Sequence, residues 1–389
     1  MAAGGGAHRR HSKGRQRLLF VVEEKRLDRH CFTYLVFKMN LKDMFASAAA
    51  EDEDPDDWAA MRNFPRRPVA RFDTLPGRPE RLDLAVVPGS GGANIVAVSS
   101  DRRTIIYDTA AAEVLSGPEL RYSMPGGVAL VPQGTRVYAV ANRLWPTTRY
   151  SHPISFQALV PPPSPAQQPS SHGRWSWGAL PDPPRGLHRV GSHSEAPFCN
   201  VTAFLAAGAR VWVSAPDRGT YSFDTARLAW RKDGDWELPF QRRGLFVPDL
   251  GLCFGLCPDR LCLCAFDSPA TATGEKEPPA ARYVWQDETF PRECIDRGFH
   301  VCSPGSLAYL GDGKFCITWT LGIEYAGEDM VPSRFALFLM AVQVVKCPSP
   351  SSREPAAAGS YLGGDQLRLV KHKKRCYKMS SHGRDGYTI

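Results

Sequence analysis

Long apolar runs are scarce in this sequence. The longest, Phe335 to Val342, has eight residues, whereas a membrane-spanning helix needs about 20. The first 17 residues are mostly Gly, Ala, His, Arg and Lys and contain no secretory apolar segment. We therefore expect no membrane span and a cytoplasmic or nuclear location. The basic, acid-free start also fits an organelle transit peptide, which stays open as an alternative.

Signatures of catalysis and cofactor binding are also missing. The sequence contains no His-x-x-x-His, Gly-x-Ser-x-Gly or His-Glu-x-x-His pattern. The glycine-rich segment 88–94 precedes an apolar, strand-like run, whereas a phosphate-binding loop precedes a helix. We expect no catalytic residue, no cofactor and no enzymatic activity.

The eleven cysteines are an odd number and lie mainly in apolar, strand-like runs. With no secretory segment, this usage indicates a reducing compartment and buried free thiols. A weak metal candidate is the cluster Cys253, Cys257, Cys262 and Cys264. Its two halves face each other across a turn, yet its members alternate with Leu and Phe as in buried hairpin strands. A core role is therefore favoured over a metal or redox site.

The formal net charge of +8 is unevenly distributed. Residues 1–22 and 371–378 together carry ten positive charges and no acid, so the remaining chain is slightly negative. A folded nucleic-acid reader usually has a basic face on its body. Any binding to nucleic acid is therefore expected to be weak and borne by the tails. The candidates for a nuclear import signal or a phosphate-contacting tail are Lys371, Lys373, Lys374 and Arg375; an ordinary solvated tail is equally open.

A repeated pattern is the main positive feature. Residues 128–140 and 201–213 align without a gap and share Gly-x-Arg-Val-aromatic at Gly134 and Gly208. Each copy is an apolar strand, a turn and a second apolar strand, which describes a β-hairpin. Looser copies occur at residues 84–98, 252–264 and 307–317. Self-similarity at about 40–50 residues is typical of propeller blades.

A second repeated segment ends in aromatic-Asp-Thr or aromatic-Asp-Ser, at Asp108, Asp224 and Asp267. These carboxylates could be imagined as a set for glycoside hydrolysis. A shared repeat position instead favours a recurring turn in which Asp bonds backbone N–H groups. The aromatic residues expected to pack the blades are Trp175, Trp177, Trp230 and Trp236.

We therefore predict an all-β fold, a kelch-like β-propeller of about six blades formed by residues 17–345 as a single domain. The ring is expected to close through apolar strands at 18–22 and 336–342. Disordered basic tails are expected at residues 1–16 and 346–389. Loop insertions are expected near residues 42–66, 160–172 and 268–281, which are acidic or rich in Pro, Ser and Ala.

Three segments carry a resemblance to a known family. They are Arg174-Trp-Ser-Trp-Gly-Ala-Leu-Pro-Asp-Pro-Pro184, Thr220-Tyr-Ser-Phe-Asp-Thr225 and Gly234-Asp-Trp-Glu-Leu-Pro-Phe240. Together they resemble a large cereal-plant family of uncharacterised kelch-like proteins, a domain of unknown function. The resemblance covers roughly residues 17–345. It implies a propeller and supplies no catalytic residues.

The function expected from these patterns is that of a non-catalytic module that binds a protein partner through the loops of the propeller. Propellers hold variable loops at both ends of a rigid ring, which suits recognition. One alternative is an enzyme acting on a sugar-like ligand in the central channel. It would need two or more acids, or His and Cys metal ligands, converging at the ring axis. Another is a nuclear nucleic-acid-associated protein that uses its basic tails.

Overall fold

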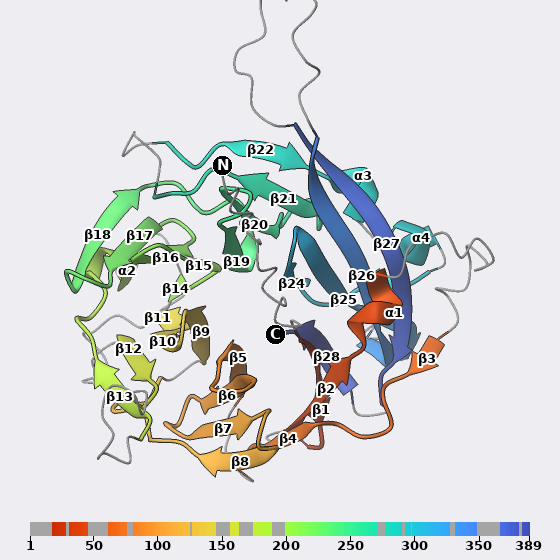
Figure 1. Cartoon of the computed structure of the whole chain (residues 1–389), viewed down its shortest axis with the longest axis horizontal. Coiled ribbons are helices and arrows are strands. Elements are labelled where there is room, and N and C mark those ends of the chain that lie inside the picture. The colour runs from red at the N-terminus through yellow and green to blue at the C-terminus, as the bar shows by residue number, and fades with distance from the viewer. Residues whose placement is uncertain are drawn as a thin grey trace, which may run out of the picture.

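The computed structural model describes most of the chain in fourteen stretches. These are residues 18–28, 31–45, 61–75, 81–124, 127–144, 156–162, 174–188, 199–270, 277–289, 292–296, 298–326, 331–347, 366–380 and 383–389. Antiparallel sheets are arranged in a ring around a central axis (Figure 1). Six four-stranded blades can be followed around the ring, so the predicted all-β propeller of about six blades is confirmed.

Each blade is given from its innermost to its outermost strand. The first blade consists of β28 (Gly383–Thr388), β1 (Leu19–Arg26), β2 (Phe32–Met39) and β4 (Ala70–Asp73). The second consists of β5 (Leu82–Pro88), β6 (Ala93–Ser99), β7 (Thr104–Asp108) and β8 (Glu113–Ser116). The third consists of β9 (Val128–Gln133), β10 (Arg136–Ala141), β12 (Phe156–Val160) and β13 (Ser176–Ala179). The fourth consists of β15 (Ala203–Ala207), β16 (Arg210–Ala215), β17 (Gly219–Asp224) and β18 (Ala229–Gly234). The fifth consists of β19 (Gln241–Val247), β20 (Leu252–Leu256), β21 (Leu263–Phe266) and β22 (Ala281–Val284). The last consists of β24 (Ser306–Gly311), β25 (Lys314–Ala326), β26 (Val331–Cys347) and β27 (Gln366–Lys378).

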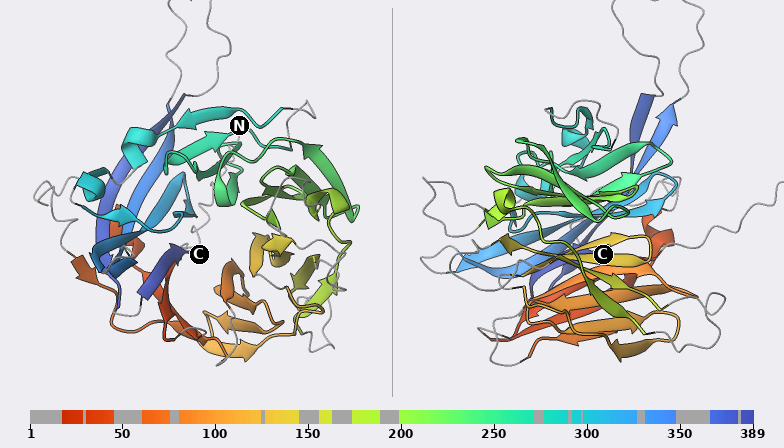
Figure 2. Two further views of the ribbon diagram at one scale, coloured as in Figure 1. Left: turned by 180° about the vertical axis from the view of Figure 1, so that it is seen from behind. Right: turned by 90° about the vertical axis from the view of Figure 1, so that its left-hand side faces the viewer.

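Short elements complete the ring. They are the strands β3 (Met61–Asn63), β11 (Arg143–Leu144), β14 (Cys199–Asn200) and β23 (His300–Val301), and the helices α1 (Leu41–Phe45), α2 (Arg185–His188), α3 (Gln286–Thr289) and α4 (Arg292–Asp296). The strands β26 and β27 extend beyond the edge of the ring (Figure 2). Apolar clusters lie between neighbouring blades; one joins Val96, Val137 and Phe223 from three of them. No helix among the described stretches is long and apolar enough to cross a membrane.

The repeated hairpins occupy equivalent places. Gly134 turns β9 into β10 and Gly208 turns β15 into β16, with φ of 57° and 55°. Both turns join the two innermost strands of a blade, so the two copies form equivalent hairpins in two blades, as predicted. The left-handed backbone of both turns favours glycine. The copy at 252–264 is offset by one strand, because its turn joins β20 to β21, the second and third strands. The equivalent turn of that blade lies between β19 and β20, at Gly251.

The predicted aspartate turn recurs at two of its three positions. Oδ1 of Asp108 accepts the N–H groups of Ala110 and Ala111, and Oδ1 of Asp224 accepts those of the second and third residues after it. At Asp267 the carboxylate instead accepts a hydrogen bond from Arg282 Nε at 2.8 Å. Each of these carboxylates lies at the end of the third strand of its blade, and none of them lines the cavity on the axis of the ring, so they do not form a hydrolytic set.

The tryptophans expected to pack the blades do so. Trp177 is buried, and its Nε1 donates to Thr104 Oγ1 of the preceding blade at 3.0 Å. Trp175 and Trp230 pack against the same apolar cluster, and Trp236 packs against the cluster formed by the fourth and fifth blades.

The prediction of how the ring closes is wrong. Residues 336–342 lie inside β26, the third strand of the last blade, and pair with β25 and β27. The closing strand is β28, which pairs antiparallel with β1 and so becomes the innermost strand of the first blade. Figure 1 shows the C-terminal end of the chain at the centre of the ring.

The prediction of a disordered tail over residues 346–389 is therefore wrong for residues 366–380 and 383–389. In β27 the apolar Leu367 and Leu369 are buried, whereas the basic Arg368, Lys371 and Lys378 are exposed. Strand pairing with β26 and burial of these leucines offset the entropy of ordering a basic segment.

The other expected tail, residues 1–16, lies outside the described residues. The insertion near 42–66 contains α1 and β3, and β3 pairs in parallel with Cys376–Lys378 of β27. Residues 163–172 of the second expected insertion and residues 271–276 of the third also lie outside the described residues.

Candidate functional site

A cavity of about 990 Å³ opens at one end of the central channel. Its lining comes mainly from the first residues of the inner strands β5, β9, β15, β19 and β24, and from β28. We call this end the channel mouth. Its charged residues are Glu24, Arg26, Arg81, Asp83, Arg242, Arg243 and Asp385. Neither the sequence motifs nor the composition pointed to this set.

Two adjacent arginines enter the channel mouth because β19 begins irregularly. Its register against β20 shifts between Gln241 and Leu245, and Arg242 has a φ of 58°. The Arg242 N–H donates to Thr202 O at 2.7 Å, at the start of the neighbouring inner strand. A left-handed non-glycine residue costs about 1 kcal/mol or more, and such residues cluster at functional sites.

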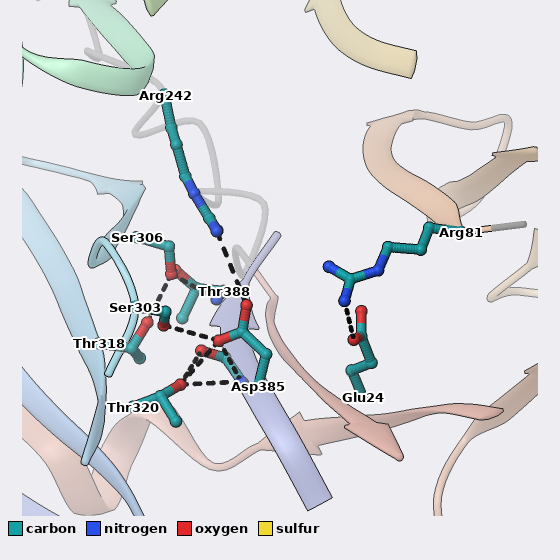
Figure 3. A network of polar contacts seen from close by, with 10 residues as sticks. Glu24, Arg81, Arg242, Ser303, Ser306, Thr318, Thr320, Asp385 and Thr388 are labelled. Carbon is teal, nitrogen blue, oxygen red and sulfur yellow. Dashed lines mark hydrogen bonds and ion pairs between the residues drawn. The ribbon is translucent and has the colours of Figure 1, made fainter. Parts of the chain in front are cut away.

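Asp385, near the start of β28, is the most extensively bonded acid of the channel mouth (Figure 3). Its Oδ1 accepts hydrogen bonds from Ser303 Oγ, Thr320 Oγ1 and its neighbour Gly386 N, each at 2.8 Å. Its Oδ2 lies 3.6 Å from Arg242 Nη2. The carboxylate thereby ties the closing strand to the last blade.

Glu24 and Arg81 face each other between the first two blades (Figure 3). The Glu24 side chain is nearly buried, and its Oε1 lies 3.8 Å from Arg81 Nη2. The Arg81 guanidinium lies 5.1 Å from the ring centroid of Phe32. Burial raises the pKa of Glu24 above its usual value, and the positive charge of Arg81 acts in the opposite direction.

Asp83 ties the inner strands of the second and third blades together. One of its oxygens accepts the N–H of Leu130 at 2.6 Å and the other that of Leu84 at 3.0 Å. Burial raises the pKa of Asp83 to about 6, although these hydrogen bonds and Arg243 favour the charged form. Burial lowers the pKa of the Arg243 guanidinium, and Asp83 opposes that shift.

The cysteine cluster lies elsewhere, in the hairpin of β20 and β21. Cys257 N donates to Cys262 O at 2.9 Å, so the two are neighbours across the turn, as predicted. Cys253 and Cys264 are buried in an apolar cluster, and burial raises the pKa of both thiols to about 12. Cys264 Sγ donates to a backbone carbonyl, that of Gly255, at 3.3 Å. A protonated thiol is a poor zinc ligand, because zinc binds the thiolate.

Among the described residues, no three or more His, Cys, Asp or Glu side chains lie together in a group that could hold a metal ion. The basic candidates Lys371, Lys373, Lys374 and Arg375 lie on β27, the outer strand of the last blade, away from the channel mouth. Lys371 is exposed, Lys373 and Lys374 are half-buried, and Arg375 is buried. They therefore belong to a folded blade, and their role in nuclear import or phosphate binding stays a prediction.

The residues of the channel mouth carry one signal that sequence analysis could have used. Arg81, Asp83, Arg242 and Arg243 each lie just before or within the first three residues of an otherwise apolar inner strand. Charges placed there in two of the repeats indicate polar groups around the axis. Asp385 was hidden because its segment was assigned to a tail.

Residues 15–377 match the model of a family described as "Protein of unknown function (DUF1668)". None of the curated protein sequences is similar to the chain.

Several solved structures are similar to the chain at low sequence identity. The Cps50 (Swd1) β-propeller domain of Myceliophteria thermophila is 9% identical, with 82% of each chain covered and a TM-score of 0.38. Chaetomium thermophilum Raptor is 11% identical, with 80% of this chain and 25% of that chain covered and a TM-score of 0.37. YCF48 bound to D1 peptide is 10% identical, with 83% and 78% covered and a TM-score of 0.36.

Proposed function

Because the chain belongs to the DUF1668 family, whose description names no activity, we propose from its structure that it is a non-catalytic β-propeller that binds a protein partner at the channel mouth. The observation that carries this proposal is the 990 Å³ cavity, lined by residues from all six blades. The kelch-like character and an origin in cereal plants stay part of the proposal and rest on the sequence resemblance alone.

The channel mouth is held rigid by contacts between neighbouring blades. Asp83 bonds the second blade to the third, Thr202 O bonds the fourth to the fifth, and Asp385 bonds the last to the first. A preorganised surface loses little conformational freedom when a partner binds, which favours affinity. Half of the 28 lining residues are charged or have a Ser, Thr, Asn or Gln side chain, whereas pockets for small molecules are lined predominantly by apolar groups.

The test compares two variants that each add one indole to opposite ends of the ring. Gln241→Trp adds bulk at the channel mouth, where Gln241 is half-buried, without changing the charge. Thr135→Trp adds the same group at an exposed position in the β9–β10 turn. Tagged full-length proteins are used to capture partners from native tissue, followed by quantitative mass spectrometry.

We expect one specific partner to be captured by the wild type and by Thr135→Trp, and to be lost by Gln241→Trp. A partner that Gln241→Trp retains and Thr135→Trp loses would move the interaction to the opposite face. Recovery of the same proteins by all three would contradict binding at either end of the channel.

A second candidate function is hydrolysis of a sugar-like ligand at the same place. Glu24, Asp83 and Asp385 all line the channel mouth, and a carboxyl with a raised pKa, as at Glu24 and Asp83, can serve as a general acid. It ranks second because both oxygens of Asp83 accept backbone N–H groups and Asp385 accepts three hydrogen bonds. Turnover of nitrophenyl glycosides that is lost in Asp83→Asn would favour this candidate over binding alone.

A further inference from the structure

The cations and anions of the channel mouth differ in their exposure to solvent. The side chains of Arg81 and Arg242 are 67% and 42% exposed, whereas those of their partners Glu24 and Asp385 are 7% and 19% exposed. A ligand entering the mouth therefore meets the guanidinium groups before it meets the carboxylates.

The exposed guanidinium groups also keep donors available. Arg81 and Arg242 lie 3.8 and 3.6 Å from their acidic partners, beyond hydrogen-bond distance, and no hydrogen bond to a described residue is formed by either guanidinium. Each guanidinium carries five N–H donors in a planar fork that matches a carboxylate. Elsewhere in the ring, Arg282 uses its fork on Asp267 at 2.8 Å.

The start of β19 is built to bring two arginines to the same side. In a regular strand, successive side chains point to opposite faces. The register shift in β19 and the left-handed conformation of Arg242 break that alternation, so Arg242 and Arg243 both line the mouth. Bulges that re-aim side chains are common beside functional sites. Gly244, the next residue, has no side chain and lies against Phe240, where a Cβ would come within 2.5 Å of the ring.

We propose that the channel mouth binds an acidic segment of the partner protein and that Arg81 and Arg242 hold its carboxylates. This inference rests on the proposed function and specifies the chemistry of the partner. The protein's own Glu24, Asp83 and Asp385 lie in the same cavity, so a continuous polyanion such as nucleic acid would meet like charge there. An acidic peptide carries its carboxylates on separate, flexible side chains, so it can present one or two of them to the arginines and keep the others in solvent, away from the protein's own acids.

The direct test measures binding of a fluorescein-labelled, acetylated hexaglutamate peptide to the full-length protein by fluorescence anisotropy. Arg81→Gln and Arg242→Asn remove one guanidinium each; asparagine is chosen at 242 because it tolerates a positive φ. The matched control is Arg227→Gln, since Arg227 is 80% exposed and lies 3.8 Å from Asp224, outside the channel mouth. Hexaglutamine is the uncharged control peptide, and inorganic phosphate and single-stranded RNA are competitors.

We expect hexaglutamate to bind and hexaglutamine not to bind. Arg81→Gln and Arg242→Asn should each weaken hexaglutamate binding about three- to tenfold, the loss typical of one charge-assisted contact at a partly exposed site. Arg227→Gln should leave the affinity unchanged, and added salt should weaken binding to the wild type. Equal effects of all three variants, or equal binding of both peptides, would overturn the proposal. So would RNA that binds through Arg81 and Arg242 and displaces hexaglutamate.

The same variants separate this inference from the proposed function. If the captured partner is lost by Gln241→Trp but retained by the double variant Arg81→Gln/Arg242→Asn, the mouth binds a protein without reading its acidic groups. The inference then fails and the proposed function stands. If the partner is retained by Gln241→Trp as well, the proposed function fails.

Discussion

Asp385 offers the sharpest test of how the ring is closed. It lies on β28, far along the chain from the strands it joins, and its Oδ1 accepts hydrogen bonds from Ser303, Thr320 and Gly386. Asp385→Ala removes the acceptor and leaves two hydroxyls and one backbone N–H without it. It also leaves Arg242 without the carboxylate that lies 3.6 Å away.

The expected loss can be worked out from these contacts. A hydrogen bond to a charged group contributes a net 1.5–3 kcal/mol or so to stability, and contributions within one network are not additive. The carboxylate is 19% exposed, so in the variant water can replace some of the hydrogen bonds that the carboxylate accepts in the wild type. We therefore expect Asp385→Ala to lower the free energy of unfolding by about 3 kcal/mol. With an m-value of about 3 kcal/mol per M for a domain of this size, the urea midpoint falls by roughly 1 M.

The assay is urea unfolding followed by tryptophan fluorescence and far-ultraviolet circular dichroism. The control is Asp249→Ala, because Asp249 is exposed and accepts one long hydrogen bond, from Tyr309 Oη at 3.3 Å. Ser303→Ala removes a single donor and should lie between the two, at about 1 kcal/mol. A midpoint for Asp385→Ala that equals that of the Asp249→Ala control would refute the tie between β28 and the last blade.

Three further outcomes are expected. Gly134→Ala and Gly208→Ala should each cost about 1 kcal/mol in urea unfolding, because a Cβ at either glycine meets no atom within 4 Å and only the left-handed backbone is strained. Ellman's reagent should modify the exposed Cys302 first, and Cys264, whose pKa burial raises to about 12, only on unfolding. Burial raises the pKa of Asp83 to about 6 in the folded protein. Protonation of Asp83 therefore stabilises the folded state at pH values below about 6, and this stabilisation is lost as the pH rises through about 6. The wild type should therefore gain about 1 kcal/mol relative to Asp83→Asn between pH 7 and pH 5, measured as urea midpoints.

The hairpins could be predicted because their determinants are local. The turns at Gly134 and Gly208 need a positive φ, which favours glycine, and the flanking runs of Val, Ala and aromatic residues suit paired strands. The error at 252–264 has the same origin. In that blade the β19–β20 turn and the β20–β21 turn both lie between apolar strands, and a pattern of strand, turn and strand does not say which pair it describes.

Ring closure could not be predicted in this way. The partner of β28 is β1, more than 350 residues away along the chain, and the segment Gly383-Arg-Asp-Gly-Tyr-Thr388 has little apolar alternation. Gly386 is buried against Leu337, where a Cβ would come within 2.8 Å of that side chain. The segment therefore fits as an inner strand because Gly386 lets Leu337 approach closely. This contact between distant parts of the chain cannot be recognised from the local sequence.

The channel mouth was missed for a related reason. Arg81, Asp83 and Arg242 are separated by up to 161 positions and share no motif. They converge only because inner strands from separate blades begin around one axis. A single charged residue before an apolar strand is common in proteins. Such residues form a shared site only when the blades are arranged in a ring, and the sequence does not show which strands then begin side by side.

The positions of the basic residues in the fold change how the alternative function, binding of nucleic acid through basic residues, has to be tested. The sequence suggested that positive charge lies in tails, so that a chain ending at residue 345 would separate tail from body. In the structure, Lys371, Lys373 and Lys374 lie on β27, and the strand after it closes the ring. Ending the chain at 345 would remove the outer strand of one blade and the inner strand of another, so any lost binding would be confounded with lost folding. The effect of charge on nucleic-acid binding can be separated from the effect of folding by neutralising exposed side chains such as Lys371 in the full chain. The salt dependence of binding then reports the number of phosphate contacts. A propeller closed by its last strand has no dispensable C-terminal end, and its charge has to be attributed to particular blades.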